Sequence, residues 1–441
     1  MIRSLPLVAA LALIPAMAVA APAPKPIPKD AKVWAAATAA RPGQLKLLEQ
    51  VVDIDSGTGD VEGGRKVGAL FAERLKALGA DVQLVPAEAP GLPENLLVTL
   101  KGTGKGRILL IGHMDTVFES GEAARRPFRT DAERAYGPGV GDEKGGVVEA
   151  IYALKILHDL GFKDCGRIQL LIETSEERGS PGTQGLIGKL ARDADVELNL
   201  EPGDTPDVLT VWRKSAATFK IVVKGRAAHA GMAPQEGRNA ATELIHQLDL
   251  FDGAFPKSGE GTTANLTLLS AGTRPNIIPD HAEVQINVRV RDLGDLDAVQ
   301  AALEKNAAKT QVPDTSVSIG RGSDGVFPPL KLNPATDALA DRAQAIYAGL
   351  GLQVTRGGNG GASESALAAA VGTPALDGLG PAGGGFHGEA EYILLSTVTP
   401  RLYLLTKLIM DLGRNPPART TSPTAAAVAG GGPHAEAGSA G

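Results

Sequence analysis

The chain has 441 residues, of which 43% are hydrophobic and 21% charged, and its formal net charge is −6. A chain of this length is usually too long to fold around a single hydrophobic core, so we expect two folded domains with tails. The composition is that of an ordinary globular protein. An acidic balance without a basic stripe argues against nucleic acid as a partner. The single cysteine allows no intrachain disulfide.

The N-terminal end, residues 1–20, is typical of a secretory signal peptide. One arginine precedes an apolar stretch over residues 5–19, and Ala18 and Ala20 form an A-x-A cleavage site. The alternative is an uncleaved membrane anchor, although the stretch is short for a membrane span. We therefore predict an exported protein, periplasmic or secreted, that begins at Ala21 and has no membrane attachment after cleavage.

Residues 25–213 predict the first part of an α/β domain. Apolar periodicity indicates helices over residues 31–52, 67–78, 145–160 and 182–192. Strand-like apolar runs cover residues 82–86, 95–100, 107–112, 167–173 and 196–200. Because strands and helices alternate, we expect an α/β sandwich with a largely parallel sheet.

From residue 214 the pattern changes to strands of period two. Residues 214–326 contain strand-like and helix-like runs in the order β-α-β-β-α-β, which predicts a ferredoxin-like α+β unit inserted into the first domain. The first domain resumes over residues 327–414, with a glycine-rich loop at residues 357–361. Residues 415–441 are rich in Pro, Ala and Gly and predict a disordered tail.

Five short islands of acidic and histidine residues follow the apolar runs or lie in glycine-rich segments. They read HMD, GDEKGG, SEE, LEPG and FHGEAE and contain His113, Asp142, the pair Glu176 and Glu177, Glu201 and His387. The carboxyl ends of parallel strands meet at one edge of a sheet. We therefore expect the islands to converge there.

Each island taken alone has an ordinary explanation. Asp142 could be a helix N-cap, and an isolated glutamate pair is most often solvated. Asp115 lies two residues after His113, on the same side of an extended chain, and could orient its imidazole. Glu176 and Glu177 repel each other unless a cation neutralises them or one of them moves protons. Together the islands form a mixed N/O ligand set that suits two zinc ions, with cobalt or manganese as substitutes.

In this order the islands resemble those of the di-zinc family of aminoacylases, acetylornithine deacetylases and glutamate carboxypeptidases. The resemblance covers about residues 31–413 and is closest to the bacterial folate-cleaving glutamate carboxypeptidases. It implies a zinc-peptidase-like α/β catalytic domain, an inserted dimerisation or lid domain, and two zinc ions per subunit.

The resemblance also implies roles for the island residues. Five of them match metal ligands of the family: His113, Asp142, Glu177, Glu201 and His387. Asp142 would bridge the two metals, while the division of Glu177 and Glu201 between them stays open. Glu176 matches the general base, and Asp115 matches the residue that orients the first histidine.

Further residues resemble the substrate-binding positions of the family. His229, in GRAAHAG, resembles a histidine that reaches the active site of the neighbouring subunit, where it could stabilise an oxyanion. Asn276 and Arg289 match substrate-side positions, and an arginine suits bidentate recognition of a terminal carboxylate. Gly360 and Gly361 lie in a loop whose backbone could donate to a carboxylate.

Two positions depart from the pattern of the family, because Glu364 and Ser175 stand where aspartate is usual. The resemblance implies a homodimeric exopeptidase that removes a C-terminal residue, glutamate above all, from N-acyl, folate-like or peptide substrates. An N-acyl amino acid deacylase or dipeptidase of the same family is the alternative. A non-catalytic exported binding protein is the rival from another class, and the intact base argues against it.

Overall fold

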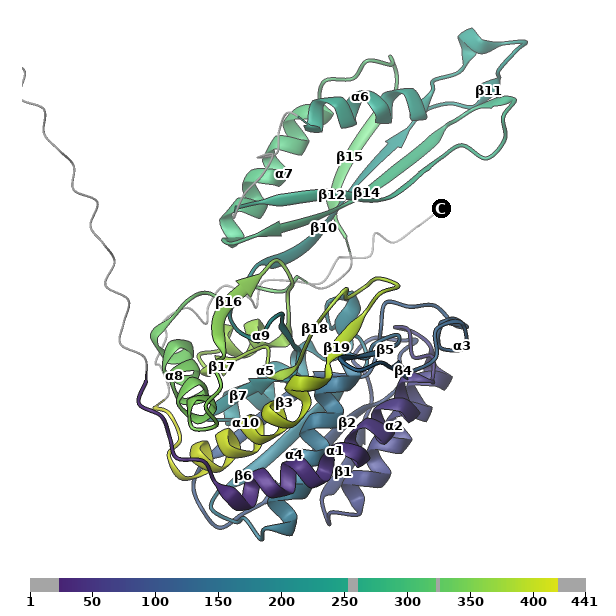
Figure 1. The fold of residues 1–441 in the computed structure, drawn as a ribbon. Coiled ribbons are helices and arrows are strands. Elements are labelled where there is room, and N and C mark those ends of the chain that lie inside the picture. Colours follow the sequence, from purple (N-terminus) through teal and green to yellow (C-terminus); the bar gives the residue numbers. More distant parts are fainter. Residues whose placement is uncertain (1–23, 253–260, 323–325, 419–441) are drawn as a thin grey trace, which may run out of the picture.

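The computed structural model describes residues 24–252, 261–322 and 326–418, which form a larger and a smaller body (Figure 1). The predicted signal peptide, residues 1–20, and residues 419–441 of the predicted tail lie outside the described residues. Within the described part of the chain, no helix has the length and apolar character needed to cross a membrane.

A six-stranded sheet forms the centre of the larger body, in the order β1-β2-β6-β3-β7-β17. Its strands are β1 (Asp81–Val85), β2 (Asn95–Lys101), β3 (Arg107–His113), β6 (Arg167–Glu173), β7 (Val196–Asn199) and β17 (Ala375–Leu376). Strands β6, β3, β7 and β17 are parallel to one another, whereas β2 runs antiparallel to β6. The predicted α/β fold with a largely parallel sheet is confirmed.

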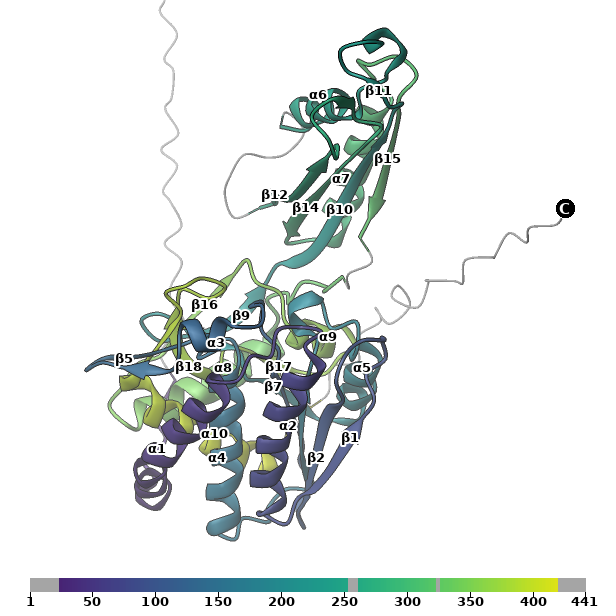
Figure 2. The ribbon, with the colours of Figure 1, turned by 90° about the vertical axis from the view of Figure 1, so that its right-hand side faces the viewer.

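Helices cover both faces of this sheet (Figure 2). One layer contains α1 (Ala31–Val52), α2 (Val61–Lys76), α4 (Lys144–Asp159) and α10 (Leu395–Arg414), and the other contains α5 (Gln184–Asp193) and α9 (Glu364–Ala370). Along β3, Ile108 and Leu110 join the core under the first layer, whereas Leu109 and Ile111 join the core under α5 and α9. This alternation follows from the period of two in a strand.

The start of one helix and several short strands differ from the predictions. Helix α2 begins at Val61, earlier than predicted, because the carboxylate of Asp60 accepts a hydrogen bond from the N–H of Gly63 and caps the helix. The predicted glycine-rich loop is partly a strand, since β16 (Thr355–Asn359) pairs in parallel with β9 (Val208–Arg213). Glycine has no side chain to show an alternating pattern, so periodicity misses such strands.

A second sheet of the larger body was not predicted either. It has five strands in the order β4-β5-β19-β18-β8. These are β4 (Arg129–Thr130), β5 (Arg134–Tyr136), β19 (Tyr392–Leu394), β18 (Gly380–Gly384) and β8 (Pro202–Asp204). Strands of two to five residues are too short for a reliable apolar pattern. The loop between β18 and β19 carries the last of the five islands.

The smaller body is a four-stranded antiparallel sheet in the order β12-β14-β10-β15, with two helices packed against it. Its elements are β10 (Ser215–Lys224), α6 (Ala240–Asp252), β12 (Thr263–Ala271), β14 (His281–Val290), α7 (Leu293–Ala307) and β15 (Ser316–Arg321). The chain therefore has the predicted β-α-β-β-α-β order. A short pair, β11 (Ala228–His229) with β13 (Ile277–Ile278), extends from the end far from the larger body (Figure 1).

Candidate metal centre

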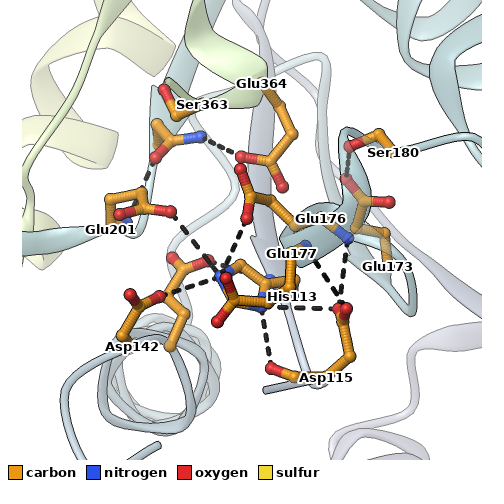
Figure 3. A network of polar contacts seen from close by, with 12 residues as sticks. His113, Asp115, Asp142, Glu173, Glu176, Glu177, Ser180, Glu201, Ser363 and Glu364 are labelled. Atoms are coloured by element: carbon orange, nitrogen blue, oxygen red, sulfur yellow. Dashed lines mark hydrogen bonds and ion pairs between the residues drawn. The ribbon is translucent and has the colours of Figure 1, made fainter. Parts of the chain in front are cut away.

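Four of the five islands meet at the carboxyl edge of the central sheet, around the last residue of β3 (Figure 3). Nε2 of His113 lies 3.1 Å from Oδ1 of Asp142 and 3.6 Å from Oε1 of Glu201. It lies 3.9 Å from Oε2 of Glu176, which opens the short helix η1 (Glu176–Arg178) after β6. These four islands therefore converge at the ends of the strands, as expected.

The fifth island approaches the same aspartate from the opposite side. Nε2 of His387 lies 3.2 Å from Oδ2 of Asp142 and 3.1 Å from Oε2 of Glu177. Asp142 thus directs one oxygen to each histidine. The alternative role of Asp142 as a helix N-cap does not apply, because Glu143 holds the cap position of α4.

Several carboxylates lie close together here with little exposure to water, which affects their pKa values. Burial raises the pKa of Glu176 well above its usual value, and burial together with the charge of Asp142 raises the pKa of Glu177 to about 7. Burial also opposes ionisation of Asp142, but its hydrogen bonds with His113 and His387 outweigh burial and keep its pKa below the usual range. Several carboxylates can be ionised together here only if cations neutralise them.

The donor set fits a pair of metal ions. Two groups of three ligand atoms share Asp142: one adds His113 and Glu201, the other adds Glu177 and His387, and within each group the atoms lie within 4.8 Å of one another. Imidazole nitrogen and carboxylate oxygen without a thiolate suit zinc, cobalt or manganese.

Two buried carboxylates at the centre were not predicted as part of it. Glu143 accepts a hydrogen bond from the N–H of His113 at 2.9 Å, and Glu364 accepts one from the side chain of Asn199 at 2.9 Å. The second oxygen of each, Oε1, is buried and has no hydrogen-bond partner among the described residues. The sequence signal for Glu143 was its position directly after Asp142. Of the two, Glu364 offers a ligand atom that lies within 4.8 Å of those of Glu176 and Glu201.

Asp115 connects the first histidine to the glutamate pair. Nδ1 of His113 lies 3.0 Å from the carbonyl oxygen of Asp115 and 3.5 Å from its carboxylate. The carboxylate accepts hydrogen bonds from the N–H groups of Glu176 and Glu177, at 3.2 and 3.4 Å, and from the hydroxyl of Thr58 at 2.6 Å. The position of the glutamates therefore depends on the same residue that contacts the imidazole.

The loop that carries His387 is fixed from two sides. The carboxylate of Glu391 accepts the N–H of Asp142 at 3.0 Å and the N–H groups of two nearby glycines at 2.9 Å. Arg126 donates to the carbonyl oxygens of the two residues that follow His387. The loop and the segment of Asp142 are thus held together although about half the chain separates them.

The predicted substrate residues fall into two groups. Arg289 and Gly361 line a cavity of about 410 Å³ whose wall also includes the candidate metal ligands, except the buried His113. Gly360 is exposed beside Gly361. His229 and Asn276 are exposed on the far tip formed by β11, β13 and the turn before β13, so the structure does not bring them to the centre of their own chain (Figure 1).

Comparison with known proteins agrees with this geometry. Residues 109–411 match Peptidase family M20/M25/M40. Carboxypeptidase G2 of Pseudomonas sp. strain RS-16 is 36% identical over 395 residues, which cover 87% of this chain and 93% of that protein. A succinyl-diaminopimelate desuccinylase of Burkholderia multivorans is 28% identical over 83% of this chain and 98% of its own length.

Solved structures show the same fold. Human carnosine dipeptidase 1 superimposes with a TM-score of 0.70 at 17% identity, over 88% of this chain and 100% of its own. A convergent set of histidines and carboxylates on this fold defines a metal-dependent exopeptidase or amidohydrolase. The chain belongs to peptidase family M20/M25/M40, and it is an enzyme of the metallocarboxypeptidase type.

We expect a chelator to destabilise the protein more at about pH 8 than at about pH 5.5. In the metal-free protein, burial and the charge of Asp142 raise the pKa of Glu177 from 4.5 to about 7, and hydrogen bonds with Asp142 and Glu177 raise the pKa of His387 from 6.5 to about 11. The stability that such raised values contribute is complete below the unfolded pKa and is lost as the pH rises through the folded pKa. Bound cations neutralise the carboxylates and remove this loss.

The measurement is the midpoint of urea unfolding with and without chelator at both pH values. A chelator effect that is equal at the two pH values, or larger at the lower one, would contradict the crowding of charge described above.

Proposed function

We propose that the chain is a di-zinc carboxypeptidase that removes a C-terminal amino acid, with glutamate preferred, from N-acyl, folate-like or peptide substrates. The observation that carries the proposal is the Asp142 carboxylate, which lies between His113 and His387 with one oxygen toward each. The similarity to Carboxypeptidase G2 supports the preference for a C-terminal residue. Bound zinc, or cobalt or manganese in its place, would polarise the scissile carbonyl and acidify a water molecule.

The division of the ligands follows from the distances. Glu201 approaches His113, and Glu177 approaches His387. We therefore propose that His113 and Glu201 would hold one metal and that His387 and Glu177 would hold the other, with Asp142 shared. This is our proposed division for the two glutamates that the sequence leaves undivided.

Glu176 is the general base in this proposal. The histidine nitrogen nearest to its carboxylate is 3.9 Å away, farther than the corresponding distance for any proposed ligand. Burial raises its pKa, so the side chain accepts a proton from the attacking water readily and can return it to the leaving amine. Asp115 positions this base through the backbone of the Glu176–Glu177 segment.

Glu176→Gln is expected to lower kcat by about 10³-fold or more, because the amide cannot take the proton of the attacking water. Metal content should stay at that of the wild type, since Glu176 is not a ligand. The matched control is Glu389→Gln, an exposed glutamate on the loop of His387 that pairs with Arg125. Turnover and metal content on an N-acyl-glutamate substrate are the measurements, and full activity in Glu176→Gln would sink the assignment.

The substrate carboxylate is assigned to the side of the cavity that the smaller body supplies. Arg289, on β14, lines the cavity, and its Nε donates to the side chain of Asn287 at 2.7 Å. The rest of its guanidinium is available for the terminal carboxylate of a substrate. Gly361 in the cavity wall and the exposed Gly360 beside it form the loop proposed to donate backbone N–H groups to this carboxylate.

A panel of leaving amino acids separates this function from its alternative. The relation to a succinyl-diaminopimelate desuccinylase keeps an N-acyl amino acid deacylase or dipeptidase as the second candidate. We expect kcat/KM to be at least about tenfold higher for C-terminal glutamate than for aliphatic residues, because an ionic contact in a buried site is worth more than 1.4 kcal/mol. A broad aliphatic preference would favour the alternative, and no turnover by metal-loaded protein would favour a binding protein.

A homodimer belongs to the same proposal, with residues 214–326 as the dimerisation domain and residues 25–213 and 327–414 as the catalytic domain. Strand β12 lies at the edge of its sheet and exposes Leu266, Leu268 and Leu269. An unpaired apolar edge is unstable in water unless a partner covers it. His229 and Asn276, exposed on the far tip, would then serve the centre of the partner, where His229 stabilises the oxyanion.

Mixing His229→Ala protein with Glu176→Gln protein is expected to restore activity. A hybrid dimer has one centre with both an intact Glu176 and a His229 from the other subunit. Since half of the dimers are hybrids at equal mixing, about a quarter of wild-type activity should return. The assay is turnover after subunit exchange has been demonstrated with two differently labelled proteins; no recovery would count against a role in trans.

Export completes the proposal. Residues 1–20 would direct the chain out of the cytoplasm and be removed, leaving a periplasmic or secreted enzyme. The support is the apolar stretch followed by the A-x-A site.

A further inference from the structure

Arg213 is a buried arginine that contacts a proposed metal ligand. It is the last residue of β9, where the chain crosses into the smaller body, and its side chain is only 4% exposed. Its Nε and Nη2 atoms each lie 2.7 Å from an oxygen of Asp377, in a bidentate pair. Nη2 also donates to Oε2 of Glu201 at 3.3 Å. One guanidinium thus joins two carboxylates.

Asp377 anchors the guanidinium. Its fully buried carboxylate also accepts hydrogen bonds from the hydroxyls of Ser363 and Ser365 and from the N–H of Gly378. Burial opposes its ionisation, but Arg213 and these donors outweigh burial and hold the pKa of Asp377 below its usual value. A carboxylate with this many hydrogen-bond donors has little freedom to move, so it fixes the orientation of the planar guanidinium group of Arg213.

The two oxygens of Glu201 have different partners. Oε1 faces Nε2 of His113 at 3.6 Å, whereas Oε2 faces Arg213. The guanidinium of Arg213 therefore determines which oxygen of Glu201 is turned toward His113. Because Asp377 already neutralises the guanidinium, Arg213 can orient Glu201 without adding much net positive charge beside a cation. We therefore expect the effect of Arg213 on the orientation of Glu201 to outweigh its repulsion of a nearby cation.

We propose that Arg213, held by Asp377, is a positioning residue for Glu201 and sets the affinity of the metal held by His113 and Glu201. This inference rests on the proposed ligand assignment. Groups behind a metal ligand commonly change metal affinity by about 10- to 100-fold when they are removed. The other metal, held by His387 and Glu177, has no such contact with Arg213 among the interactions of the described residues.

The test is a Co²⁺ titration of metal-free enzyme, followed by visible absorption, in the wild type and in Arg213→Lys. Lysine keeps the charge but cannot hold two carboxylates with a planar fork. We expect one of the two Co²⁺ affinities to fall about tenfold and the other to stay unchanged. The matched control is Arg107→Lys, since Arg107 also joins two carboxylates, those of Asp193 and Asp195, at the opposite end of β3 from His113. Neither affinity should change in the control.

A second variant keeps the test decisive if Arg213→Lys does not fold. Ser363→Ala combined with Ser365→Ala removes two donors from Asp377 without touching a charge, and we expect it to weaken the same site about threefold. Unchanged affinities in the folded variants, or equal losses in Arg107→Lys, would overturn the role of Arg213 while the di-metal function stands. A wild-type enzyme that binds fewer than two Co²⁺ ions per subunit would instead overturn the function and the inference together.

Discussion

The shared carboxylate of Asp142 is the constraint on which the rest of the centre depends. A buried aspartate that directs one oxygen to each of two histidines must be ionised, and around it lie glutamates whose pKa values burial raises. Such a group is unfavourable without a compensating charge. Bound cations would lower this cost for all of these carboxylates at once.

The architecture explains how this group is assembled from distant segments. His113 and Glu201 come from neighbouring parallel strands, or the residues just after them, so their separation is set by the sheet. Asp142 and His387 come from two loops, and Glu391 joins these loops through backbone N–H groups. Rigid strands therefore fix one half of the centre, while a hydrogen-bonded carboxylate fixes the other half.

Much of the fold and of the centre was predictable from the sequence, and the features that were not predicted were missed for identifiable reasons. Long apolar runs such as the one before His113 have a clear pattern, so the central strands and the islands at their ends were found. The sequence left the division of Glu177 and Glu201 open, because it does not show which way a side chain just after a strand turns. Arg213 and Asp377 were missed because they act through Glu201 and lie in no island. Their pairing across 164 residues is a product of the fold alone.

The cavity beside the centre is lined by residues of both bodies, and this arrangement limits which substrates can fit. Asp142, Glu201 and His387 belong to the larger body, whereas Arg289 lies on β14 of the smaller one. A substrate whose carboxylate contacts Arg289 while its scissile bond lies at the centre must touch both bodies. Ser215 donates to the carbonyl oxygen of Phe327 at 2.7 Å, so the two chain crossings between the bodies are tied together. In the proposed function, the way in which the bodies are joined would therefore select the distance between the substrate carboxylate and the scissile bond, and substrates of the wrong length would lose one of the two contacts.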